Sequence, residues 1–282
     1  MKKKLIKIAL TGRTNSGKSS LFNSLLGKKI SIINKKINTT NDLITGIINI
    51  QETQIILYDT PGTNYLSKKI SFNKNFRSNI WNAIDHSDLI MYLVDSKKFN
   101  LTNTINDLIK IQETNKKIIF VFNKIDLIDS KIIIPFIEQI NNTLIIDSFF
   151  NISVKKNKGI NNLIKYLKTK SNFKNWTYKK DQFTDKDNIF ITNECTRNSI
   201  LQFLHKEIPY KLIVRNILYK ILKNKDIKIK QSIDLDNIRY KRIVIGKKGE
   251  TIKRIREKSQ NDISKVLNMK VHLYLKINKI ND

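Results

Sequence analysis

Apolar and polar positions alternate in a regular way along the first part of the chain. Apolar runs of strand length recur at 5–10, 43–50, 54–58, 88–95, 117–122 and 149–155. Apolar residues at helical spacing occupy 20–26, 101–114 and 160–167. Two of the runs, 88–95 and 117–122, are apolar almost without interruption, as in strands that a parallel sheet buries on both faces. This alternation predicts a three-layer α/β domain with a mostly parallel sheet and a ligand at the carboxyl ends of its strands.

The pattern changes after a polar stretch rich in Lys, Asn, Asp and Thr. Beyond it, the pattern predicts in turn a helix, two strands, a basic amphipathic helix and a closing strand, at 200–204, 211–223, 227–235, 252–266 and 271–277. This order predicts a second, smaller α+β domain. We therefore expect a first domain over 1–172, a linker over 173–188 and a second domain over 189–282.

Residues 12–19 match G-x-x-x-x-G-K-[ST], the pattern of a phosphate-binding P-loop. They stand between an apolar strand and a helix, so backbone N–H groups and the positive end of the helix dipole face an anion. Gly12 and Gly17 let the backbone approach phosphate without a Cβ in the way. We expect Lys18 to reach the β- and γ-phosphates and Ser19 to bind Mg²⁺.

A second phosphate-site motif, Asp59-Thr60-Pro61-Gly62, ends the apolar run at 54–58. A carboxylate at the end of a buried strand beside a P-loop is placed to hold Mg²⁺, usually through water, and the Gly62 N–H can donate to the γ-phosphate. The same four residues are common in turns. Their place after an apolar strand favours the Walker B element.

The strand at 117–122 ends in Asn123-Lys124-Ile125-Asp126. A carboxylate such as Asp126 can accept both the N1–H and the N2 amino protons of guanine, whereas adenine presents no such pair of donors. Asn123 can tie the loops together, and the Lys124 stem can cover the ring. The motif therefore predicts guanine, with residues 149–155 as the last strand and base-binding loop.

The second domain carries Val244-Ile245-Gly246-Lys247-Lys248-Gly249 before its basic helix. A G-x-x-G turn that leads into such a helix is the RNA-clamping element of a KH domain. A solvated turn is the alternative interpretation of the motif. We assign RNA binding to Arg239, Arg242, Ile245, Gly246, Lys247, Lys248, Gly249, Lys253, Arg254 and Arg256.

The net charge of +29 predicts a polyanionic partner. A chain rich in Ile, Asn and Lys throughout is also what a genome poor in G and C would encode, so part of the charge reflects composition. Four of the eight arginines fall between 239 and 256, which a lysine bias does not explain.

The single cysteine, Cys195, excludes an intramolecular disulfide and a thiolate metal site. No apolar run approaches the ~20 residues of a membrane span, and the run after Lys2–Lys4 is too short for a secretion signal. We expect a cytoplasmic monomer. Its charge leaves weak peripheral contact with the inner face of the cell membrane open.

Taken together, G-R-T-N-S-G-K-S, Thr39-Thr40, D-T-P-G, N-K-I-D, Ser153 and V-I-G-K-K-G resemble the Era family, bacterial ribosome-assembly GTPases of the TrmE-Era-EngA-like superfamily with a C-terminal KH domain of type II. The resemblance spans roughly residues 5–278. A double-GTPase relative would need a second P-loop, and a tRNA-modifying relative would need a C-terminal cysteine motif. Neither is found in this sequence.

The resemblance implies slow hydrolysis of GTP to GDP and binding of the 3′ end of small-subunit (16S) ribosomal RNA during 30S subunit assembly. It implies Mg²⁺ bound by Ser19, Thr40 and Asp59, and catalytic roles for Lys18, Thr40, Asp59 and Gly62. Thr39 is a close alternative to Thr40. Asn15 matches an asparagine linked to K⁺ in the superfamily, and Ser153-Val154 would place N–H groups near the guanine O6. The nucleotide-binding residues are then Gly12, Arg13, Thr14, Asn15, Ser16, Gly17, Lys18, Ser19, Ser20, Asp59, Thr60, Pro61, Gly62, Asn123, Lys124, Asp126, Ser153, Val154 and Lys155.

Three positions depart from the family pattern. Thr63 stands where many GTPases carry a glutamine that orients water, which predicts slow intrinsic turnover. Val154 replaces the usual alanine, and Asn41 the usual arginine. The alternative function is an RNA-binding assembly chaperone that binds GTP with little turnover. An ATPase or kinase is disfavoured by the guanine motif.

Overall fold

The structure, a computed structural model, describes residues 2–28, 30–31, 43–65, 74–204, 208 and 212–279. The chain divides into two compact units; the main boundary falls between Asp185 and Lys186, and Lys28, Ile30 and Ser31 are grouped with the second unit. Each unit has its own sheet and its own buried core. Thr39, Thr40 and Asn41 lie outside the described residues.

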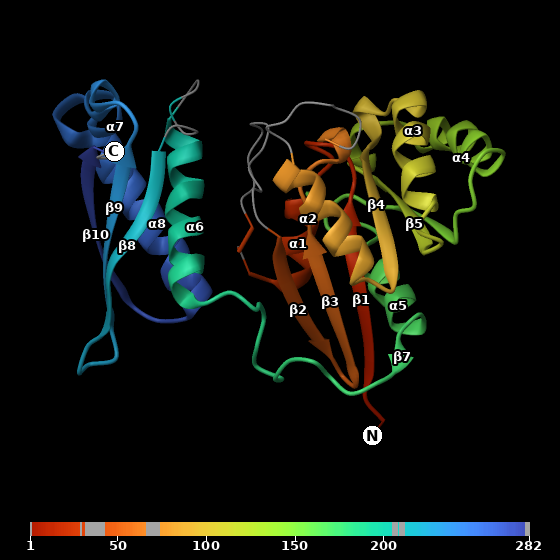
Figure 1. Ribbon diagram of the computed structural model, residues 1–282, viewed down its shortest axis with the longest axis horizontal. Coiled ribbons are helices and arrows are strands. Elements are labelled where there is room, and N and C mark those ends of the chain that lie inside the picture. The colour runs from red at the N-terminus through yellow and green to blue at the C-terminus, as the bar shows by residue number, and fades with distance from the viewer. Residues whose placement is uncertain are drawn as a thin grey trace. The chain divides into compact units, whose positions relative to one another are not determined.

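The sheet of the first unit has seven strands among the described residues. Six of them lie in the order β2 (Ile44–Ile50), β3 (Thr53–Asp59), β1 (Lys4–Thr11), β4 (Leu89–Asp95), β5 (Lys117–Asn123) and β6 (Ser148–Asn151) (Figure 1). β2 is antiparallel to β3, and the other neighbours are parallel. The seventh strand, β7 (Asn172–Phe173), pairs antiparallel with the first residues of β1. The mostly parallel α/β sheet predicted from the sequence is confirmed.

Five α-helices of the first unit are described: α1 (Lys18–Leu26), α2 (Lys74–Asp85), α3 (Leu101–Gln112), α4 (Ile133–Asn141) and α5 (Ile160–Thr169). One core cluster joins α2, α3 and α4 to alternate residues of β4 and β5, among them Tyr92 and Phe120. The intervening residues Met91, Leu93 and Val121 are buried as well. Because side chains alternate across a strand, both faces of the sheet are covered. Helix α4 is not among the elements predicted from the sequence.

Short 3₁₀ turns connect these elements: η1 (Thr63–Tyr65), η3 (Ser96–Lys98), η4 (Ile125–Leu127) and η5 (Ser130–Ile132). The turns η3 and η4 start within two residues of the carboxyl ends of β4 and β5, and η1 directly follows the motif that ends β3. The strand ends therefore carry the residues from which a site can be built.

The stretch expected to be a linker is bonded to the first unit over most of its length. The Trp176 indole N–H donates to the Glu52 carbonyl at 3.0 Å, and the backbone N–H groups of Thr177 and Tyr178 both donate to Gln54 Oε1. Further along, Thr184 forms an antiparallel bridge with Gly46. Residues 173–185 thus line the sheet of the first unit, which leaves the change of unit to a few residues around 186.

The second unit contains α6 (Asn188–Phe203), β8 (Leu212–Ile221), β9 (Ile227–Leu235), η7 (Ile238–Tyr240), α7 (Lys241–Ile245), η8 (Lys247–Gly249), α8 (Glu250–Leu267) and β10 (Val271–Lys279). Its sheet has the order β10-β9-β8, antiparallel between β8 and β9 and parallel between β9 and β10. The predicted helix face holds, because Ile255, Ser259 and Ile263 of α8 are fully buried. No helix in the described part of the chain is long and apolar enough to span a membrane.

Candidate nucleotide and RNA sites

The P-loop between β1 and α1 depends on glycine at two positions. Gly12 has φ +131°, and a Cβ added there would lie 2.1 Å from the Leu93 carbonyl oxygen. Gly17 has φ +103°, and its Cβ would lie 2.2 Å from Asn123 Nδ2. Both the backbone conformation and the space exclude any larger residue. The loop therefore packs directly against β4 and against the motif that ends β5.

Lys18 is buried at the start of α1, and its ammonium group donates to the carbonyl oxygens of Gly12 at 2.7 Å and Arg13 at 3.0 Å. Burial lowers the pKa of Lys18 to about 8, an effect partly offset by the charge of Asp59. A phosphate anion in the loop would favour the charged lysine. The side chain is thus held inside the loop where the sequence placed it.

Ser19 and Asp59 lie together, and the serine hydroxyl donates to Asp59 Oδ2 at 2.9 Å. Asp59 is fully buried at the end of β3. A hydroxyl and a carboxylate are hard oxygen donors of the kind that Mg²⁺ prefers, usually with several waters retained. The pair therefore fits the metal implied for this site. Outside it, no cluster of three or more His, Cys, Asp or Glu among the described residues could hold a metal ion.

Gly62 follows β3 and lies against the P-loop, because a Cβ there would fall 2.4 Å from Thr14 Cγ2. The Thr60 hydroxyl donates to the Leu10 carbonyl at 2.8 Å, and Thr14 N–H donates to Asn64 Oδ1 at 2.9 Å. The Asp-Thr-Pro-Gly motif and the P-loop are thus in direct contact. Only glycine fits at this position, because any Cβ would clash with Thr14.

Asp107 of α3 connects the two phosphate motifs through hydrogen bonds. It accepts hydrogen bonds from Arg13 Nε at 2.9 Å, from the Thr63 hydroxyl at 2.7 Å and from the Tyr92 hydroxyl at 3.0 Å. Its side chain is buried, as are those of Thr63 and Tyr92. The Arg13 side chain thus points to α3, so its contribution to the nucleotide site is made by its backbone. The Thr63 hydroxyl is bonded to a carboxylate rather than turned toward the phosphate side.

The base motif is built around Asn123, buried at the end of β5. Its Nδ2 donates to the Ser16 carbonyl at 2.9 Å, which ties the base motif to the P-loop. The Lys124 ammonium reaches over the loop to the Asn15 carbonyl at 2.9 Å and pairs with Asp95 Oδ2 at 2.5 Å. The two motifs that the sequence predicted separately therefore form one site.

Asp126 follows in η4, and the Ser153 hydroxyl donates to its Oδ1 at 2.5 Å. This hydrogen bond, with nearby Lys155 and Lys156, lowers the pKa of Asp126 below its usual range. The carboxylate is therefore ionised at neutral pH and can accept a pair of donors from a base. The N–H of Val154 is directed to Asn123 Oδ1 at 3.3 Å.

The second unit places its G-x-x-G turn between α7 and α8. Gly246 has φ +75°, and a Cβ there would lie 2.1 Å from Thr251 Oγ1. Gly249 has φ +80° with open space around it, and its N–H donates to the Gly246 carbonyl at 3.3 Å. Lys247 and Lys248, between the glycines, are exposed. The turn can therefore bring a backbone close to phosphates that two cations neutralise.

The remaining assigned residues lie in the elements next to this turn. Arg239 lies in η7, while Arg242 and the half-buried Ile245 lie in α7. Lys253, Arg254 and Arg256 lie in the first turns of α8, and the Arg254 guanidinium stands 4.8 Å from the Phe203 ring centroid. The arginine cluster seen in the sequence thus gathers on one part of the second unit, beside its glycine turn.

Four residues of the first site escaped the sequence analysis: Asn64, Asp95, Ser96 and Asp107. Asp107 left a signal, since it stands among the apolar positions of the helix at 101–114, where an acid has no reason to be buried unless it is bonded. Ser96, whose hydroxyl donates to the Asn123 carbonyl at 2.7 Å, has no comparable pattern.

Comparison with known proteins adds two family models. The model of the 50S ribosome-binding GTPase matches residues 7–124, and the model of the KH domain matches residues 207–282.

Whole-chain similarity extends to curated proteins and solved structures. GTPase Era of Rickettsia akari (strain Hartford) is 39% identical over 276 residues, which cover 96% of this chain and 91% of that protein. GTPase Era of Brucella suis biovar 1 (strain 1330) is 32% identical over 268 residues, covering 95% and 86%. A crystal structure of Era in complex with MgGDPNP and nucleotides 1506–1542 of 16S ribosomal RNA superposes with a TM-score of 0.89 at 27% identity, covering 99% of this chain and 95% of that one.

Proposed function

The chain belongs to the Era family of GTPases, and from this premise we propose that it is a GTP-hydrolysing switch whose KH domain binds the 3′ end of small-subunit (16S) ribosomal RNA during assembly of the 30S subunit. The observation that carries the proposal is the bond from Asn123 to the Ser16 carbonyl, which joins a guanine-reading motif to a phosphate loop. The RNA part is supported by the glycine turn and its cations in the second unit.

The nucleotide contacts follow from this geometry. The ionised Asp126 accepts the N1–H and N2–H protons of guanine, and the stem of Lys124 covers one face of the ring. Lys18 lies against the β- and γ-phosphates, and Gly62 N–H donates to the γ-phosphate. A base that lacks the donor pair, such as adenine, leaves the Asp126 carboxylate without partners and is rejected.

Mg²⁺ would be held by Ser19 and Asp59, with Thr40 of the first switch as the proposed third protein ligand. Bound there, the ion neutralises charge on the phosphate oxygens during phosphoryl transfer. Asn15, with φ +64° and its carbonyl bonded to Lys124, is the residue we assign to K⁺.

Our expectation for the rate of GTP hydrolysis rests on Thr63. Its hydroxyl is engaged by Asp107, and a threonine has no amide to orient water. We therefore propose a slow intrinsic rate that an RNA or ribosomal partner raises. The second candidate, an RNA-binding assembly chaperone with little turnover, is favoured by the same contact and differs only in the rate.

We place the GTPase domain at residues 1–185 and the KH domain from 186 onward. The end of the first domain, expected at 172, thus moves to 185, where the segment that is hydrogen-bonded to the first unit ends. Weak peripheral membrane contact stays a prediction of charge alone, which co-sedimentation with anionic vesicles would test.

Competition binding tests the nucleotide part directly. GTP and GDP should each displace fluorescent GDP, whereas a hundredfold excess of ATP should not. Binding of an oligonucleotide with the 16S 3′ sequence should fall on replacement of Lys247 and Lys248 by glutamine while GDP affinity stays unchanged. Displacement by ATP, or RNA binding untouched by the double substitution, would refute the respective assignment.

A further inference from the structure

A second basic and aromatic surface lies on the first unit, at the amino ends of the parallel strands. It is formed where the segment after α5 runs beside the start of β1, with Phe173 paired to Lys4 and Lys174 N–H bonded to the Lys3 carbonyl at 3.1 Å. The nucleotide motifs follow the opposite ends of these strands. We call it the amino-edge surface and define it as Lys2, Lys3, Lys4, Phe173, Lys174, Trp176, Tyr178, Lys179 and Lys180.

Two aromatic rings of this surface, one exposed and one half-buried, lie beside cations. Phe173 is 70% exposed, although it belongs to a strand. The ammonium groups of Lys4 and Lys2 lie 5.1 and 5.8 Å from its ring centroid. The Trp176 ring has the Lys3 ammonium at 5.5 Å and is fixed by its indole N–H bond to the Glu52 carbonyl. Trp176 is thus held in place, and each ring has a lysine ammonium near its face.

Trp176 and Tyr178 also line a cavity of about 530 Å³. Gln51 and Thr177 add polar groups to its wall. The lining residues include three lysines and one carboxylate. These lysines are Lys3, Lys179 and Lys180, and the carboxylate is Glu52. The volume is that of a small-ligand pocket. A flat heterocycle finds aromatic walls and polar edges there, and an anion attached to it finds positive charge.

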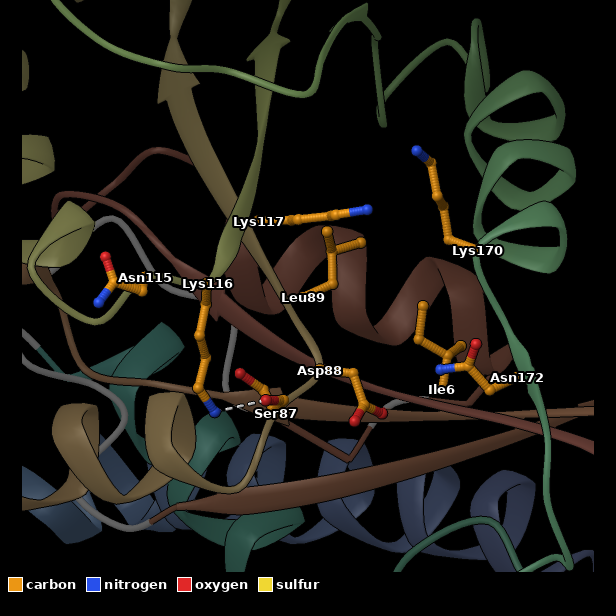
Figure 2. A pocket seen from close by; sticks show the side chains of 9 residues that line it. All are labelled: Ile6, Ser87, Asp88, Leu89, Asn115, Lys116, Lys117, Lys170 and Asn172. Atoms are coloured by element: carbon orange, nitrogen blue, oxygen red, sulfur yellow. Dashed lines mark hydrogen bonds between the residues drawn. The ribbon is translucent and has the colours of Figure 1, made fainter.

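A second cavity, of about 350 Å³, has Asn172 of β7 and three lysines among its lining residues. Figure 2 shows Lys117 and Lys170 projecting over it, with Asp88 at its edge. The Lys170 ammonium is held by Asp147 at 3.0 Å. Asn172 lines this cavity and precedes Phe173 in β7.

We propose that the amino-edge surface is a second RNA-binding site, which takes unpaired nucleotides by stacking bases on Phe173 and Trp176 while the lysines neutralise their phosphates. Aromatic rings interleaved with cations are the platform that single-stranded nucleic acid uses, and only unpaired bases can stack on them. The rings belong to an extended segment with polar neighbours, whereas membrane-surface binding typically uses an amphipathic helix. The site does not depend on the glycine turn of the second unit.

Trp176 provides a local reporter for this site. The chain has two tryptophans, and Trp81→Phe leaves Trp176 as the only one. The full-length protein is titrated at low salt with a 12-nucleotide oligoadenylate while tryptophan fluorescence is followed. Binding at the glycine turn is measured separately with the 16S 3′ oligonucleotide. A loss of one binding activity can thus be told apart from a loss of the other.

We expect saturable quenching of Trp176, with a midpoint that Phe173→Ala raises about fivefold or more, as the loss of one stacked base requires. Phe173 is mostly exposed, so its truncation leaves no cavity in the core. Lys179→Glu should raise the midpoint similarly. Lys131→Glu makes the same change of charge at an exposed residue outside the surface and should change the midpoint less than twofold.

Three results would overturn the proposal. The first is an absence of quenching, or quenching that both Phe173→Ala and Lys179→Glu leave unchanged. The second is equal quenching by inorganic polyphosphate of matched charge, which would make the surface a general anion site without base stacking. The third is quenching by phosphatidylglycerol vesicles but not by RNA, which would make it a membrane contact.

Discussion

The contact of Asp107 with both phosphate motifs leads to a quantitative prediction. In Asp107→Ala, the hydroxyls of Thr63 and Tyr92 lose their acceptor while their side chains stay fully buried. Burial, reinforced by the charge of Asp107, raises the pKa of Tyr92 far above its usual value, so this hydroxyl keeps its proton at neutral pH.

Each buried, unsatisfied donor costs about 1–3 kcal/mol. Arg13 adds little, because its side chain is 31% exposed and water can replace the carboxylate. Relief of the burial of the Asp107 charge offsets part of the cost. The balance predicts a loss of about 2–5 kcal/mol from the first unit. GDP affinity should fall as well, since the P-loop loses its bond to α3.

Denaturation in urea, followed by tryptophan fluorescence, measures this loss of stability in the first unit. Both tryptophans, Trp81 and Trp176, belong to the first unit, so the signal reports its unfolding and not that of the KH domain. Asp181→Ala removes an exposed acid from the same unit and should change stability by about 0.5 kcal/mol or less. A loss of less than about 1 kcal/mol in Asp107→Ala, with an unchanged dependence on urea, would contradict the reasoning.

Four further predictions concern the two binding sites and the stability of the nucleotide-free protein. Because the pKa of Lys18 is about 8 in the nucleotide-free protein, GDP binding should take up about a tenth of a proton at pH 7 and about three quarters at pH 8.5, as measured by calorimetry in buffers of different ionisation enthalpy; uptake that does not rise with pH would contradict it. The folded Lys18 loses its proton near pH 8, whereas the unfolded lysine keeps its proton to about pH 10.5. The free energy of unfolding of the nucleotide-free protein should therefore rise as the pH rises from 8 to 10.5. Asp126→Asn should weaken GDP binding about a hundredfold while xanthosine diphosphate binds better, because an amide can donate to the xanthine carbonyl; unchanged base preference would exclude Asp126 as the reader. Lys247→Gln with Lys248→Gln should lower the slope of log affinity for RNA against log salt by about 1–2, and an unchanged slope would remove both lysines from the phosphate contacts.

Elements with a strong local pattern could be predicted from the sequence. The P-loop, the strand ends and the buried face of α8 follow from apolar spacing and from the demands of phosphate on the backbone. Helix α4 could not be predicted, because its sequence combines a nearly continuous apolar run with Pro135. Proline in the first turn of a helix loses no intrahelical hydrogen bond, so Pro135 is compatible with the helix.

The remaining misses arise from contacts between residues far apart in the chain. The stretch at 173–185 has a linker's composition, yet the fully buried Gln54 binds its backbone at Thr177 and Tyr178. Asp107 is likewise explained only by Arg13 and Thr63, which a helical pattern cannot reveal. The sequence pattern does not show which distant residues such polar side chains bind, and in this chain they bind the phosphate motifs and the segment after α5.

GTP turnover in K⁺ and Mg²⁺, with and without an oligonucleotide of the 16S rRNA 3′ end, tests most directly whether the two domains act as one switch. We expect a slow basal rate that rises with this RNA and not with a scrambled sequence, and a rise that is lost when Lys247 and Lys248 are replaced by glutamine. A basal rate that the RNA leaves unchanged, in a protein that binds both GTP and RNA, would contradict the coupling and favour the chaperone with little turnover.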